Sequence, residues 1–190
     1  MNEFWLYLNQ GIHHILDLQG LDHLCFIVSF CLLYSLKDWK HIVGLVTAFT
    51  LGHCITLIIS GFNIVSIKSS FVEILIPITI FSSCLNNYWC LIRNKQSNPS
   101  TLFTYGILLT FGLIHGLGFS NFLKMMMFEN DSITRPLLAF NIGIEIAQLI
   151  IVFTFLIFML FIQKIKVNSN YLRLIINTII VLVILNFLIN

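Results

Sequence analysis

The chain has 190 residues, of which 58% are hydrophobic and only 9% are charged, and its mean hydropathy is +0.94. Soluble domains carry about 25% charged residues, so this composition excludes a water-soluble protein and predicts an integral membrane protein. The net charge of +2 and the lack of a basic cluster argue against a nucleic-acid partner. Membrane lipid is the expected surrounding.

The first segment, residues 1–19, is predicted to be a short amphipathic helix at the outer membrane surface. Phe4, Leu8, Ile12 and Ile15 recur at helical spacing along it, which is typical of helices that rest in the membrane interface. Gly20 then marks the turn into the first apolar run.

The rest of the chain is a series of apolar runs. A transmembrane helix needs about 20 apolar residues, and six segments meet this length within a few residues at each end. They are 20–36, 41–62, 71–91, 101–123, 136–162 and 171–189. The predicted fold is therefore all-α: a single polytopic membrane domain over residues 1–190, with six transmembrane helices preceded by the interfacial helix.

Positive charges predict the orientation of these spans. Cytoplasmic segments of membrane proteins carry an excess of Lys and Arg. The connections after the second and fourth predicted spans carry Lys68, Lys124 and Arg135. The connections after the first, third and fifth predicted spans, on the opposite side of the membrane, carry Lys37, Lys40, Arg93, Lys95, Lys164, Lys166 and Arg173. Seven against three predicts that the second set is cytoplasmic and that both termini lie outside.

A few ionisable residues lie within or at the start of the spans. Such residues cost about 2.5–3.5 kcal/mol each at the bilayer centre on insertion scales and usually mark functional sites. They are Asp22, His23, His53, Glu73, His115 and Glu145. Counted along the helices, all fall in the outer half of the membrane, and His53, His115 and Glu145 lie about 14 Å below its outer surface. This shared depth predicts one buried site that opens outward.

The side chains suit a transition metal. Imidazoles mixed with carboxylates favour Ni²⁺, Co²⁺, Zn²⁺ or Cu²⁺, whereas a set of oxygen ligands alone favours Mg²⁺ or Ca²⁺. The candidate ligands are His14, Asp22, His23, His53, His115 and Glu145. Thr50, Glu73, Asn141 and Gln148 are expected to surround and orient them. Whether Glu73 and His13 belong to the site is open, and a structural polar network without metal is the alternative.

Five motifs together resemble the HupE/UreJ family of bacterial membrane proteins, in the form common in Bacteroidota. They are "GIHHILDLQGLDHLCF", "TAFTLGHCITL", "VEILIPITI", "FGLIHGLGFS" and "FNIGIEIAQL", and they run in order from Gly11 to Leu149. The resemblance maps family motif positions onto Gly11, His14, Asp22, His23, Thr50, His53, Val72, Glu73, His115 to Phe119, Asn141, Gly143 and Glu145. The sequence departs from the family pattern at Cys54, where Ser is common, and at Ala147, where Gly is common.

The resemblance implies a protein of the bacterial inner membrane and a nickel or cobalt permease or metal-handling accessory protein, because the family is named after accessory genes of nickel enzymes. In this first hypothesis the site captures a divalent ion from outside and passes it inward. The weakness is the inner half, where Ser82, Ser83, Asn86 and Asn87 offer polar atoms but no charge.

The alternative is an intramembrane metal-dependent hydrolase or transferase that acts on a lipid or membrane-anchored substrate. The metal would then stay bound and activate water, with Glu145 or Asp22 as general base. No established catalytic signature supports this reading, and a sensor or assembly factor is the third possibility. The catalytic residues, the metal and the oligomeric state are not decided by the sequence.

Overall fold

The computed structural model describes residues 3–17, 21–62, 64, 68–93, 102–127, 134–165 and 168–189, without the side chains of 69 and 120–127. All regular structure in these ranges is helical, which confirms the all-α prediction. The elements are α1 (Glu3–Leu16), α2 (Leu21–Cys31), the 3-10 helix η1 (Leu36–Asp38), α3 (Trp39–Gly61), α4 (Ser69–Ile92), α5 (Leu102–Met127), α6 (Thr134–Lys164) and α7 (Ser169–Ile189).

The number of long spans differs from the prediction. Within the described residues, five helical segments are long and apolar enough to cross a membrane: 36–61, 70–92, 102–119, 134–164 and 169–189. The first predicted span, 20–36, contains only one α-helix, the 11-residue α2. A helix of that length extends about 17 Å, much less than the roughly 30 Å of a hydrocarbon core.

A local helix-start signal explains why α2 is short. The Asp38 carboxylate accepts hydrogen bonds from the backbone N–H of Ser35 at 3.0 Å and from its hydroxyl at 2.8 Å. This capping pair begins η1 and α3, because it satisfies polar groups that the start of a new helix leaves without intrahelical partners. The chain therefore restarts a helix at the point where the apolar run suggested that the first span continues.

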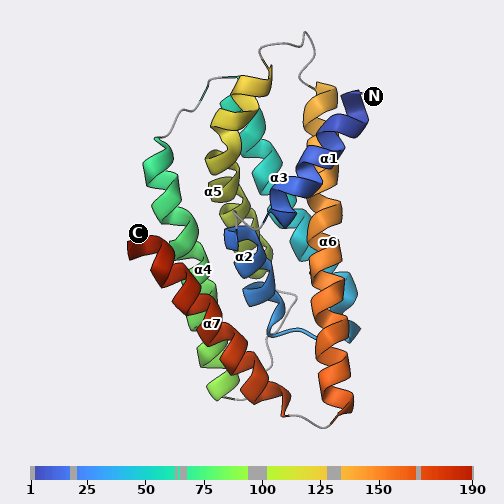
Figure 1. The fold of residues 1–190 in the computed structure, drawn as a ribbon, viewed down its shortest axis with the longest axis vertical. Helices are drawn as coiled ribbons and strands as arrows, with labels where there is room; N and C mark the ends of the chain where they lie inside the picture. Colours follow the sequence, from blue (N-terminus) through green and yellow to red (C-terminus); the bar gives the residue numbers. More distant parts are fainter. Residues whose placement is uncertain are drawn as a thin grey trace.

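The predicted N-terminal helix is present as α1, but it is not isolated from the bundle. Figure 1 shows α1 lying across the upper part of α6, with α2 continuing downward after it. Gly11 faces the backbone of Phe140 and Ile144, and Gly143 faces the backbone of Leu8. The two glycines let the helix backbones approach closely, as small residues do in membrane proteins.

Glycines also bring α3 and α5 together. Gly52 of α3 faces the backbone carbonyl of Leu109, and Gly112 of α5 faces the carbonyl of Phe49 and the N–H of His53. Gly116 lies against the His53 carbonyl one turn further along α5. Because the backbones meet at these points, the pairing of α3 with α5 fixes where His53 and the neighbouring His115 are placed.

We expect Gly112→Ala to loosen this pairing. The added methyl group would overlap the Phe49 carbonyl oxygen, and relieving such overpacking costs about 1–3 kcal/mol. Gly106→Ala is the matched control, since no atom lies within 4 Å of its added methyl group and alanine favours a helix more than glycine does. Thermal unfolding in detergent should show a lower Tm for Gly112→Ala only; equal shifts would contradict the packing argument.

A polar connection to the last helix, which was not predicted from the sequence, lies in the opposite half of the bundle. The Asn87 side-chain amide of α4 donates hydrogen bonds to the Ser29 carbonyl at 2.7 Å and to the Asn177 oxygen at 3.0 Å. The Asn177 amide of α7 donates to the Cys84 carbonyl at 3.1 Å. Both asparagines are buried, so the network joins α2, α4 and α7 through satisfied polar groups.

Candidate metal centre

Three histidines from three helices meet in the upper part of the bundle. His14 lies near the end of α1, His23 near the start of α2 and His53 within α3. One nitrogen from each ring lies within 4.8 Å of the other two. In a tetrahedral site with bonds of 2.0–2.1 Å, ligand atoms lie about 3.3 Å apart, so small side-chain rotations bring these nitrogens to bonding distance of one ion.

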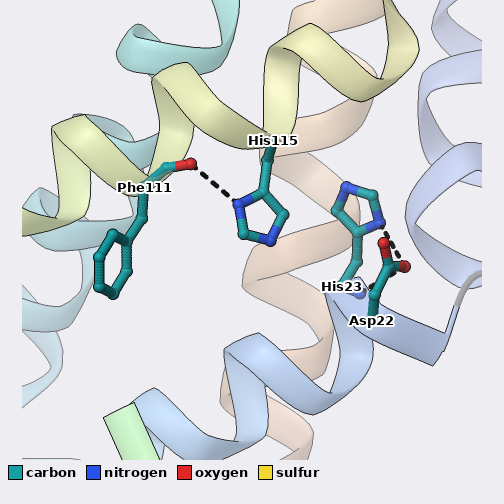
Figure 2. Close-up of polar contacts among 4 residues, drawn as sticks. All are labelled: Asp22, His23, Phe111 and His115. Carbon is teal, nitrogen blue, oxygen red and sulfur yellow. Dashed lines mark hydrogen bonds and ion pairs between the residues drawn. The ribbon is translucent and has the colours of Figure 1, made fainter. Parts of the chain in front are cut away.

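A fourth histidine stands beside this group. The His115 ring of α5 lies 5.6 Å from the His23 ring, centroid to centroid, and Figure 2 shows the two rings next to each other. His115 Nδ1 lies 2.9 Å from the Phe111 carbonyl oxygen. Because a carbonyl only accepts hydrogen bonds, Nδ1 carries the proton and Nε2 keeps a free lone pair.

Asp22 orients His23 in a similar way. Its Oδ1 lies 3.1 Å from His23 Nδ1 and also accepts a hydrogen bond from the His23 backbone N–H at 2.9 Å (Figure 2). A carboxylate that accepts the proton of one ring nitrogen fixes the tautomer and increases the basicity of the other nitrogen. His23 therefore presents Nε2 as a potential ligand atom.

Several buried ring nitrogens have no hydrogen-bond partner among the described residues. They are Nε2 of His14, His23 and His115, and both ring nitrogens of His53. His53 is fully buried, and each unsatisfied buried polar group costs about 1–3 kcal/mol. A cluster of imidazoles with free lone pairs is costly as plain packing, but it fits the ligand set of a borderline divalent cation.

The cluster opens into a cleft of about 250 Å³. Its wall consists of His14, Asp17, Asp22, His23, Glu73, Ile76, His115, Gly118 and Phe119. The sequence left open whether Glu73 belongs to the site. Glu73, on α4, is one of the residues that line the same cleft. His13 is exposed and is not among the residues that line the cleft. An ion in the cleft would meet carboxylates before it reached the imidazoles.

The polar residues of α6 have other partners. The Thr47 hydroxyl donates a hydrogen bond to the Glu145 carboxylate at 2.6 Å, and the Thr50 hydroxyl donates to Gln148 at 3.0 Å. Of the α6 candidates, Asn141 lies beside His53, and its side-chain oxygen has no hydrogen-bond partner within the described ranges. The group of three histidines that can share an ion within the described residues does not include Glu145.

Aromatic rings, which the sequence reading did not assign to the site, surround the histidines. Phe119 lies 4.1 Å from His14 and stacks on Phe140 at 4.7 Å, centroid to centroid. Phe26 and Phe49 each lie 5.1 Å from His115. The one feature of the sequence that could have indicated these rings is that phenylalanines occur near the histidines in the chain, as in the motif around His115. Phenylalanine is too common in this chain, with 18 copies, to be singled out on that basis.

Metal affinity is expected to fall at low pH, because only neutral imidazole binds metal and protons compete with the ion. The ordinary imidazole pKa is about 6.5, so the loss should develop as the pH drops below about 6. Calorimetric titration with Ni²⁺ at several pH values between about 7.5 and 5 checks this. An affinity that stays unchanged over that range would contradict a site built from histidine ligands.

Fold and site together define an all-helical membrane protein with a buried histidine cluster that can hold a metal ion. The family model described as "HupE / UreJ protein" matches residues 1–190. The chain therefore belongs to the HupE/UreJ family, as the five motifs suggested. No curated protein and no solved structure gives a significant match to this chain.

Proposed function

We propose that this protein is a permease for a divalent transition metal of the nickel or cobalt type. The observation that supports this most is the convergence of four imidazoles, each with a buried nitrogen that has no partner among the described residues; three of the four line one cleft. The association of the family with nickel and cobalt uptake agrees with it. The ion is the transported substrate in this proposal, and His14, His23 and His53 are its first ligands.

The chemistry of capture follows from the order of groups along the cleft. Exposed Asp17 and Glu73 attract a hydrated cation to the mouth. Imidazole nitrogens then replace water ligands, and they bind nickel or cobalt more readily than Mg²⁺ or Ca²⁺. His115, whose ring lies next to that of His23, offers a further Nε2, so a fourth imidazole is available to the ion.

The distribution of charge supports an outward-facing cleft. The opposite end of the bundle, where α2, α4 and α6 end and α3, α5 and α7 begin, carries Lys37, Lys40, Arg93, Lys164 and Arg173. There Arg93 lies 3.4 Å from the centre of the Trp89 ring, in the aromatic belt expected at an interface. By the positive-inside rule this end is cytoplasmic, and membership of the HupE/UreJ family supports a location in the bacterial inner membrane.

We further propose that α1 and α2 cross the membrane together. They follow one another down the length of the bundle (Figure 1), and each alone is too short to span it. The break between them places His14 and His23 at membrane depth, as broken helices do in other transporters. With five further crossings, both termini lie outside.

The experiment is metal influx into liposomes that contain the purified protein and an internal fluorescent Ni²⁺ indicator. We expect saturable influx with the native protein and none with His53→Leu. If native influx equals that of empty liposomes, the permease proposal is wrong. An ion that remains bound at one per chain through dialysis would then favour the intramembrane metalloenzyme.

A further inference from the structure

A second cavity lies in the opposite half of the bundle from the histidines. Its volume is about 530 Å³. It is lined by Phe26, Phe30, Leu33, Tyr34, Ser82, Ser83, Asn86, Asn87, Trp89, Cys90, Phe103, Thr104, Ile107, Leu108 and Phe111. Tyr34, Trp89 and Phe103 lie where α2 and α4 end and α5 begins, so the cavity is at the end of the bundle with the positive charges.

The α4 wall of this cavity is polar. Ser82, Ser83, Asn86 and Asn87 form two consecutive turns of one helix face, and Thr104 faces them from α5. Ser82 and Asn86 are exposed although they lie within a helix that is long and apolar enough to span the membrane. Hydroxyl and amide groups in that position are costly next to lipid, and residues of this kind usually face a water-filled space.

Aromatic side chains separate this cavity from the histidine cluster. Phe26 and Phe111 line the upper end of the cavity, and their rings lie 5.9 Å apart. Phe26 also stacks on Phe49 at 4.8 Å and contacts His115 at 5.1 Å. The same Phe111 accepts the hydrogen bond from His115 through its carbonyl. We call Phe26, Phe49 and Phe111 the aromatic barrier.

We propose that the 530 Å³ cavity is a water-filled inner vestibule through which the metal ion leaves toward the cytoplasm, and that the aromatic barrier closes it from the outer site. This inference rests on the proposed permease function. Neutral oxygen atoms suit an exit, because they replace water around a cation weakly and release it readily. A hydrophobic constriction blocks ions by excluding water until it opens.

The test measures whether water reaches Ser82, which lies about 15 Å from the end of α4 at Ile92. In a Cys90→Ser background, Ser82→Cys is exposed to a charged, membrane-impermeant thiol reagent from each side of the membrane. Leu85→Cys is the matched control, because Leu85 is on the same helix, is 52% exposed and does not line the cavity.

We expect rapid labelling of Ser82→Cys from the cytoplasmic side, slow labelling from the outer side, and slow labelling of Leu85→Cys from both. Labelling of Ser82→Cys as slow as that of Leu85→Cys would mean that the cavity is filled by lipid, which overturns the vestibule. Equally fast labelling from both sides would overturn the barrier. Adding Phe26→Ala should make Ser82→Cys reactive from outside.

A second measurement separates this inference from the function on which it rests. Labelled Ser82→Cys should still bind Ni²⁺ at the histidines but lose Ni²⁺ influx into liposomes. If the native protein shows influx but Ser82→Cys does not react, the vestibule proposal is wrong and the permease proposal stands. If the native protein shows no influx, the permease proposal is wrong whatever the labelling shows, and the vestibule cannot be a metal exit.

Discussion

Replacing His53 by leucine is expected to abolish high-affinity metal binding without destabilising the metal-free protein. Leucine keeps a side chain of similar size, and it removes two buried ring nitrogens that have no partner among the described residues. Because each unsatisfied buried group costs about 1–3 kcal/mol, the metal-free variant should unfold at the same Tm as the native protein or higher. Metal affinity should fall by more than about 100-fold. Loss of a residue that only supports a ligating histidine already weakens binding by about 10–100-fold, and His53 is expected to be a ligand itself.

The measurement is thermal unfolding in detergent with and without Ni²⁺, together with calorimetric titration. The native protein should gain about 2.7 kcal/mol at a metal concentration 100 times the Kd, and His53→Leu should gain nothing. His41→Leu is the control, because His41 is exposed at the other end of α3. A metal-free His53→Leu protein that is strongly destabilised, or one that still binds metal, would show that His53 has a structural role.

Asp22→Asn should weaken metal binding by about 10–100-fold, the range typical of a lost carboxylate behind a ligating histidine. The asparagine oxygen can still accept a hydrogen bond from His23 Nδ1, so the tautomer is kept. The negative charge that increases the basicity of His23 Nε2 is removed. We therefore expect an intact site of lower affinity, measured by titration with Ni²⁺ or Co²⁺.

Glu73→Gln is the control for loss of charge alone. Glu73 lines the same cleft but is exposed, and exposed charge interactions contribute about 0–1 kcal/mol. Its effect on affinity should stay below about fivefold. Equal effects of the two substitutions would indicate that the cleft attracts the cation only by its total charge, and Asp22 would then have no special relation to His23.

The helices could be predicted from the sequence because long apolar runs have few alternatives in a membrane. The exception was residues 20–36, where apolar composition predicted one span and the capping pair of Ser35 and Asp38 starts a new helix instead. Hydropathy averages over a window and does not register such a short polar signal. The close approach of α1 to α6 through Gly11 and Gly143 depends on helix orientation, which composition does not contain.

The convergence of the histidines could be predicted only in part, because it also depends on helix orientation. Depth along each helix placed His53, His115 and Glu145 at one level, but depth does not tell in which direction a side chain points. Glu145 accepts a hydrogen bond from the Thr47 hydroxyl of α3, whereas His14, which lies on the predicted interfacial helix, reaches His23 and His53. The polar residues of the inner half on α4 were identified from the sequence, but the cavity that they line could not be predicted, because it forms only when α4 is set against α2 and α5.

X-ray absorption spectroscopy of the Ni²⁺- or Co²⁺-loaded protein tests the central claim most directly, since it reports the atoms bound to the ion. We predict a first shell that contains three or four imidazole nitrogens at about 2.0–2.1 Å, the distance of metal–histidine bonds in comparable sites. The imidazole count should fall in His14→Ala and stay unchanged in His13→Ala, whose side chain is exposed. A shell of oxygen atoms alone, or a spectrum that His14→Ala leaves unchanged, would contradict a metal site built from His14, His23 and His53.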